Sequence, residues 1–202
     1  MNDFNLWLSD FVLWAKIGIE HITDWQGADH MLFIVITAGF YSLSDWKKSL
    51  WLSLAFTLGH SITLVLSTYH IISLPTNIIE CLIPITILLA VIFRILETMN
   101  LLHTSQRYLF ASIVLFGCIH GLGFSNVLKS MLGREMNILN PLLAFNIGLE
   151  FGQILILSFV IILGHLVQNI LNYSRSIWNW SIIVIVGISS IYLIYDRLMM
   201  VI

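Results

Sequence analysis

Charged side chains are scarce in this chain. Asp, Glu, Lys and Arg make up 10% of its 202 residues, whereas hydrophobic residues make up 58%. Because a water-soluble domain carries about a quarter charged residues, this chain could not cover its own surface in water. The net charge of −2 and the lack of a basic run also argue against a nucleic-acid partner. The composition predicts an all-α integral membrane protein in contact with the lipid bilayer.

Other features are also missing. The two cysteines, Cys81 and Cys118, both lie inside apolar runs, so a structural disulfide is not expected. The first ten residues contain Asp3 and Asp10 but no Lys or Arg, unlike the start of a cleaved signal peptide. The sequence has no GxxxxGK[ST] motif, no aspartyl-phosphate segment and no HExxH motif. Nucleotide-driven pumping is therefore not expected.

The apolar runs predict a bundle of six to seven transmembrane helices in a single domain, residues 1–202. A spanning helix needs roughly 20 mostly apolar residues. Six segments meet or approach this length, and a seventh at the N-terminus carries three charged residues. That seventh segment either spans the bilayer or lies partly in its interface. In chain order, the expected helices cover residues 4–20, 29–43, 50–68, 76–97, 107–123, 141–165 and 178–196.

Basic residues in the short loops predict the orientation, since they favour the cytoplasmic side. Three alternating turns share that side by this rule, at 44–49, 94–107 and 166–177, and they contain Lys47, Lys48, Arg94, Arg107 and Arg175. The opposite side has Lys129 and Arg134. We therefore expect the helix at 29–43 to begin at the outer surface and the helix at 107–123 to end there, next to His120.

Ionisable residues are concentrated just before the second apolar run. The stretch GIEHITDWQGADH, residues 18–30, contains Glu20, His21, Asp24, Asp29 and His30. Further polar residues interrupt later runs, and these are His60, Glu80, His120, Asn146, Glu150 and Gln153. An ionisable group is expensive in hydrocarbon, so it needs a partner or a function. Five segments thus place imidazoles or carboxylates between the outer surface and the midplane.

Imidazole and carboxylate groups together are typical ligands of first-row transition metals. The predicted metal ligands are His21, Asp24, Asp29, His30, His60, His120 and Glu150, with Glu80, Asn146 and Gln153 expected beside them. Adjacent helical residues point about 100° apart, so Asp29 could orient a ligand histidine instead of binding the ion. Gly148 and Gly152 would allow close helix approach, and Gly121 and Gly123 would let the backbone come close to the site.

Structural roles compete with this interpretation. Asp24 and Asp29 are also suited to cap helix N-termini. His21 could be hydrated at the membrane interface, and His60 could bond a neighbouring carbonyl group. Glu80 and Glu150 could bridge helices through Thr76, Asn146 or Gln153. The sequence leaves these alternatives open.

The order of motifs resembles that of the HupE/UreJ family, closest to its HupE/UreJ-2 branch. The motifs are GxxHIxDxxxxDHxLF at 18–33, FTLGHSITL at 56–64, IPITIL at 83–88 and FGxIHGLGF at 116–124. His21, Asp29, His30, His60, His120 and Glu150 match the family's functional positions, although seven residues separate His21 from Asp29 where the family usually has five. The resemblance implies a multi-pass protein of the bacterial inner membrane with a role in nickel uptake.

The sequence thus favours a transition-metal permease, with residues 21–30 on the periplasmic side. The transported ion would be nickel by resemblance, and copper, cobalt, zinc or iron fit the same ligands. One alternative is an intramembrane metal-dependent hydrolase with Ser61 or Asp29 near a bound water. Another is a haem-binding electron carrier with two axial histidines. The oligomeric state stays open, a homo-oligomer included.

Overall fold

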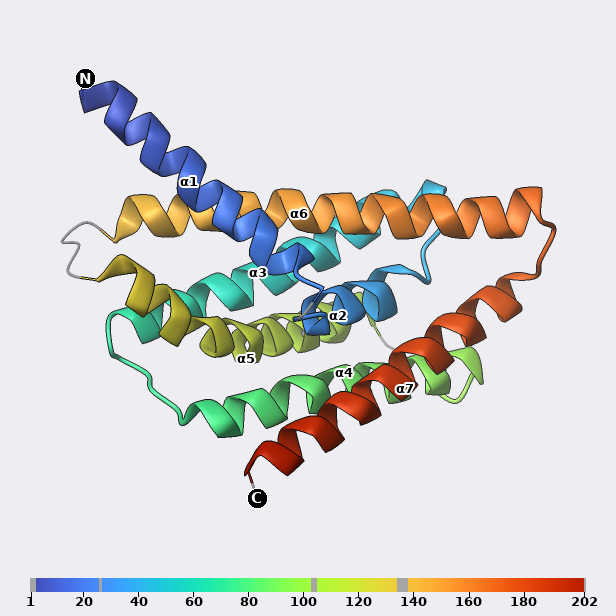
Figure 1. Cartoon of the computed structure of the whole chain (residues 1–202). Helices are drawn as coiled ribbons and strands as arrows, with labels where there is room; N and C mark the ends of the chain where they lie inside the picture. Colours follow the sequence, from blue (N-terminus) through green and yellow to red (C-terminus); the bar gives the residue numbers. More distant parts are fainter. Residues whose placement is uncertain (1–2, 26, 103–104, 134–137, 202) are drawn as a thin grey trace.

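The computed structural model describes residues 3–25, 27–102, 105–133 and 138–201. Every regular element in these ranges is helical (Figure 1). A 3₁₀ turn, Leu43–Asp45, precedes α3, and a π-helical turn, Leu166–Ile170, follows α6. Arg134, which contributed to the predicted orientation, lies outside the described residues. The α-helices are α1 (Asp3–Thr23), α2 (Asp29–Ala38), α3 (Trp46–Thr68), α4 (Thr76–Thr98), α5 (Gln106–Leu132), α6 (Leu139–His165) and α7 (Arg175–Val201).

Five helices within the described ranges are long and apolar enough to cross a membrane, namely α3, α4, α5, α6 and α7. Their outward faces expose large apolar side chains, as a surface in contact with lipid does. On α7, for example, Ile185 and Ile188 are 62% and 65% exposed. The predicted all-α, multi-pass membrane bundle is therefore confirmed.

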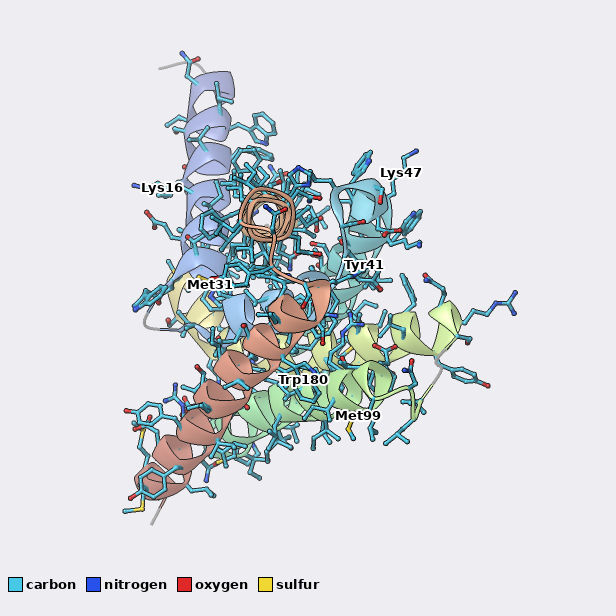
Figure 2. The ribbon with its side chains drawn as sticks, turned by 90° about the vertical axis from the view of Figure 1, so that its right-hand side faces the viewer. Lys16, Met31, Tyr41, Lys47, Met99 and Trp180 are labelled. Atoms are coloured by element: carbon cyan, nitrogen blue, oxygen red, sulfur yellow. The ribbon has the colours of Figure 1, made fainter. Side chains whose placement is uncertain are left out.

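The first two helices differ from the expected spans. The helix expected at 29–43 ends at Ala38 and has ten residues, about 15 Å of length at 1.5 Å per residue, or half a hydrocarbon core. Helix α1 is longer, but it carries charged residues, and Lys16 and Glu20 form an exposed ion pair on it at 3.5 Å. Figure 2 shows Lys16 pointing away from the bundle. Neither helix belongs to the five candidate spans.

Helices α1 and α2 instead follow one another along α6. Ile22, near the end of α1, lies against Gly152, and Gly39, just after α2, lies against Val160. The break between the two helices therefore lies beside the middle of α6 (Figure 1). We expected the helix at 29–43 to begin at the end of the bundle. This expectation was wrong, because α2 begins beside the middle of α6 and follows α1 after a break in the helix. Interrupted helices of this kind are common at transporter binding sites.

Side chains from α4 and α7 hold the C-terminal end of α2. Arg94 is buried, and its guanidinium donates to the carbonyl of Ile36 at 3.1 Å and to that of Thr37. From α7, Trp178 Nε1 donates to the carbonyl of Gly39 at 2.8 Å. The last carbonyls of a helix have no intrahelical partner, so these bonds allow α2 to end inside the protein.

Helix α5 also ends later than expected, at Leu132 and not near residue 123. The residues after 123 continue a helical face, and Leu128 and Leu132 on it are buried. His120 consequently lies near the middle of α5. The expectation that it ends its helix at the outer surface was wrong, because polar residues such as Ser125 interrupt the apolar run without ending the buried face.

Two helix pairs approach closely through glycine. A Cβ on Gly59 of α3 would overlap the backbone of α5, and one on Gly148 of α6 would overlap the backbone of α1. Gly121 faces the carbonyl of His60 in the same way. The close helix approach expected at Gly148 is thus present, and together with that at Gly59 and Gly121 it brings the histidine-bearing segments together.

Candidate metal centre

Three histidines from three helices meet inside the bundle. His21, His30 and His60 each offer one ring nitrogen, and these nitrogens lie within 4.8 Å of one another. The ring centroids of His21 and His30 are 4.6 Å apart, and that of His60 lies about 6 Å from both. His30 is 4% exposed and His60 is fully buried. The arrangement can bring three neutral imidazole donors to one ion.

A fourth imidazole adjoins this group. The ring of His120 lies 4.9 Å from that of His30, centroid to centroid, and is fully buried. Its Nε2 faces the hydroxyl of Thr86 at 3.4 Å. Across the described part of the chain, the buried ring nitrogens without a hydrogen-bond partner are His21 Nε2, His30 Nε2, both nitrogens of His60, and His120 Nδ1. Buried polar atoms are rarely left unpaired, so this cluster suits a ligand that accepts nitrogen lone pairs.

Asp29 orients His30. Its Oδ1 lies 2.8 Å from His30 Nδ1 and also accepts the backbone N–H of His30 at 2.8 Å. This leaves His30 Nε2 directed to the cluster, because a nitrogen bonded to a carboxylate is not the one that binds an ion. Asp29 therefore bonds the His30 side chain, which is the contact that its alternative role, orienting a ligand histidine, requires.

Four phenylalanines enclose the histidines, and the sequence interpretation missed them. The ring of Phe124 lies 3.9 Å from that of His21, centroid to centroid, and Phe56 lies 5.1 Å from His120. By the same measure, Phe33 lies 5.5 Å from His120, and Phe145 lies 6.3 Å from His60. A signal was present, since residues three or four apart share a helical face and three of these rings follow or precede a motif histidine at that spacing.

A depression of about 510 Å³ leads to His21 between α1 and α5. Asp24 and Trp25 lie at its exposed mouth, and Trp25 is 85% exposed. We call this depression the vestibule, and its lining residues are Ile17, Glu20, His21, Thr23, Asp24, Trp25, Phe124 and Met131. Asp24 thus lies at the mouth of the vestibule and is not among the clustered imidazoles.

Glu80 lies apart from the histidines. Its carboxylate faces Arg197 of α7 at 3.7 Å and is 42% exposed. The two side chains border a narrow space that also touches Asp29. Glu80 therefore links α4 to α7, which is the bridging role that the sequence left open for it, although with a different partner.

The remaining predicted residues form a separate set of contacts between α3 and α6. Glu150 Oε2 accepts a hydrogen bond from Thr57 at 2.6 Å. Asn146 Oδ1 accepts one from Ser61 at 2.6 Å. We call this set the oxygen seam, and it consists of Ser53, Thr57, Ser61, Asn146, Glu150 and Gln153. The carboxylate of Glu150 is not among the donor atoms that cluster with the histidines.

Comparison with known proteins identifies the family of the chain. The sequence profile described as HupE / UreJ protein matches residues 2–196, nearly the whole chain. The chain belongs to the HupE / UreJ family. This family is associated with nickel and cobalt transport, so metal permeation is the activity supported at the family level. A transporter-type family also disfavours the hydrolase alternative. No curated protein and no solved structure matches the chain.

Proposed function

We propose that the chain is a permease for a divalent transition-metal ion, with nickel favoured, and that His21, His30, His60 and His120 hold the ion during transit. The observation that supports this most is the group of three imidazole nitrogens within 4.8 Å of one another. Neutral imidazole suits Ni, Co, Zn, Cu and Fe. A bound ion would supply the partner that these buried nitrogens lack.

The vestibule is the proposed route to the centre. Carboxylates of Glu20 and Asp24 border it and would concentrate cations by their charge. His21 lines the vestibule and also belongs to the imidazole cluster, so it can receive the ion and pass it to His30 and His60. Phe124 lies over His21 and narrows this passage.

We place the vestibule on the periplasmic side of a bacterial inner membrane, since the basic loops favour the opposite side as cytoplasmic. A membrane potential of 100 mV favours inward movement of a divalent ion by about 4–5 kcal/mol. That driving force is sufficient for uptake without nucleotide hydrolysis. Exchange with protons on the imidazoles can contribute, because histidine binds metal only when deprotonated.

Metal uptake into proteoliposomes tests this proposal. His30→Ala and His60→Ala should lower the initial rate of Ni²⁺ uptake at least about tenfold, while both variants keep the wild-type elution profile in detergent. His165→Ala is the matched control, because His165 is exposed at the end of α6 and bonds Asn169. Wild-type uptake in both centre variants, with Ni²⁺ retained on the purified protein, would reject the proposed centre.

A further inference from the structure

The oxygen seam contains oxygen atoms in an arrangement that a metal-binding imidazole cluster does not require. Ser53 Oγ lies 2.5 Å from Gln153 Oε1. Thr57 Oγ1 lies 2.6 Å from Glu150 Oε2 and 2.9 Å from the same Gln153 oxygen. These four side chains converge from two facing helices, and each presents an oxygen to the others.

The three hydroxyl groups of the seam have more acceptor oxygens within reach than hydrogens to donate. The hydroxyl of Thr57 carries one hydrogen but lies within reach of three acceptors, including the carbonyl of Ser53 at 3.3 Å. The hydroxyl of Ser61 also carries one hydrogen, and it faces the carbonyl of Thr57 and Asn146 Oδ1. With the Ser53 contact, six oxygen–oxygen contacts, five of them of 2.9 Å or less, share three hydroxyl hydrogens. A proton on Glu150 would add only one hydrogen, whereas a cation accepts several lone pairs at once.

The charge of the seam is also unbalanced. None of the ion pairs among the described residues involves Glu150. Its Oε1 is buried and has no hydrogen-bond partner there. A carboxylate with one oxygen buried and no counter-charge is costly. One positive charge would balance it.

Ligand type and charge together define the ion. Hydroxyl, amide and carboxylate oxygens are hard donors that suit hard cations. A single carboxylate balances one positive charge, whereas calcium sites use several carboxylates. We propose that Ser53, Thr57, Glu150 and Gln153 form a site for a small monovalent cation of the sodium class, distinct from the histidine centre.

The position of this site links it to the metal. Thr57 and His60 lie about one helical turn apart on α3, and Ser61 of the seam directly follows His60. Two cations held this close repel one another, so sodium in the seam should weaken binding of a divalent ion at the imidazoles, and by linkage the reverse. This antagonism rests on the proposed function of the histidine centre, whereas the sodium site itself does not.

Thermal unfolding of the purified protein tests the site. Sodium chloride is titrated against choline chloride at constant ionic strength, without divalent metal. At a sodium concentration ten times its Kd, the wild-type Tm should rise by about 3–6 °C. Glu150→Gln, which keeps the side-chain shape, and Ser53→Ala should remove this rise. Ser112→Ala is the control, since Ser112 donates to the carbonyl of Tyr108 within α5, and it should keep the rise.

A Co²⁺ titration on the same samples tests the antagonism. Saturating sodium should weaken Co²⁺ binding about fivefold or more in the wild type and leave it unchanged in Glu150→Gln. The inference would be overturned if neither the Tm nor the Co²⁺ affinity of the wild type changed with sodium. The same conclusion would hold if, in addition, Glu150→Gln changed only the pH dependence of Tm. In that case normal Co²⁺ binding leaves the permease proposal standing. If the wild type did not bind Co²⁺ but its Tm still rose with sodium, the histidine centre would be rejected and the sodium site would stand.

Discussion

Replacement of Arg94 should loosen α2 and, through it, the histidine centre. Arg94 is 7% exposed and supplies donors to the carbonyls of Ile36 and Thr37, and it bonds Glu97 at 2.7 Å. Its guanidinium also lies 4.8 Å from the ring centroid of Phe40. We consider Arg94→Met, which keeps most of the side-chain volume but removes every donor.

The magnitude follows from the two carbonyls. Each buried carbonyl left without a donor costs about 1–3 kcal/mol, so the pair costs about 2–6 kcal/mol. For a chain of this size, each kcal/mol lowers Tm by about 2–4 °C. We therefore expect Arg94→Met to lower Tm by at least about 4 °C. It should also weaken Co²⁺ binding, because α2 carries His30 at its other end.

Arg175→Met is the matched control. Arg175 also donates to a carbonyl after α2, that of Phe40, at 2.8 Å, but this bond is exposed and water can replace it. Exposed substitutions of this kind change stability by about 0.5 kcal/mol or less. Differential scanning fluorimetry and Co²⁺ titration in detergent measure both effects. Equal Tm values for Arg94→Met and the wild type, or an equal loss in both variants, would refute the anchoring role of Arg94.

Two further substitutions have expected outcomes of their own. Gly148→Ala should destabilise the protein by about 1–3 kcal/mol, because the added Cβ overlaps the carbonyl of Ala15. The control Gly187→Ala, whose Cβ would meet a side-chain carbon at 3.4 Å, should be neutral or stabilising. Thermal unfolding compares the two variants, and equal Tm values would contradict the close helix approach. Asp29→Asn should weaken Co²⁺ binding about 10–100-fold because it removes the carboxylate that orients His30; an unchanged Kd by titration would show that the ring needs no such partner.

The helices that span the bilayer were predictable because each needs a long apolar run. The runs near 50–68 and 76–97 correspond to α3 and α4. The interruption between α1 and α2 was not predictable in this way, since a length criterion treats each run as a separate crossing. The end of α2 at Ala38 depends on Arg94 and Trp178, which reach it from other helices.

The candidate centre was predictable in its histidines and less so in its acids. An imidazole inside an apolar run is informative by itself, because few structural roles explain it. The side-chain direction of an acid on an amphipathic helix depends on helix rotation, which the sequence does not fix. Phe145 of α6 faces His60, and one residue further Asn146 faces Ser61. Glu150 lies one helical turn after Asn146 and therefore faces the same way, so it joins the oxygen seam and not the imidazoles.

X-ray absorption of the Ni²⁺-loaded, purified protein tests the proposed centre most directly. The account predicts at least three imidazole nitrogens in the first coordination shell of nickel, and one fewer in His30→Ala and in His60→Ala. Nickel bound through oxygen alone, or an unchanged number of imidazoles in both variants, would contradict it.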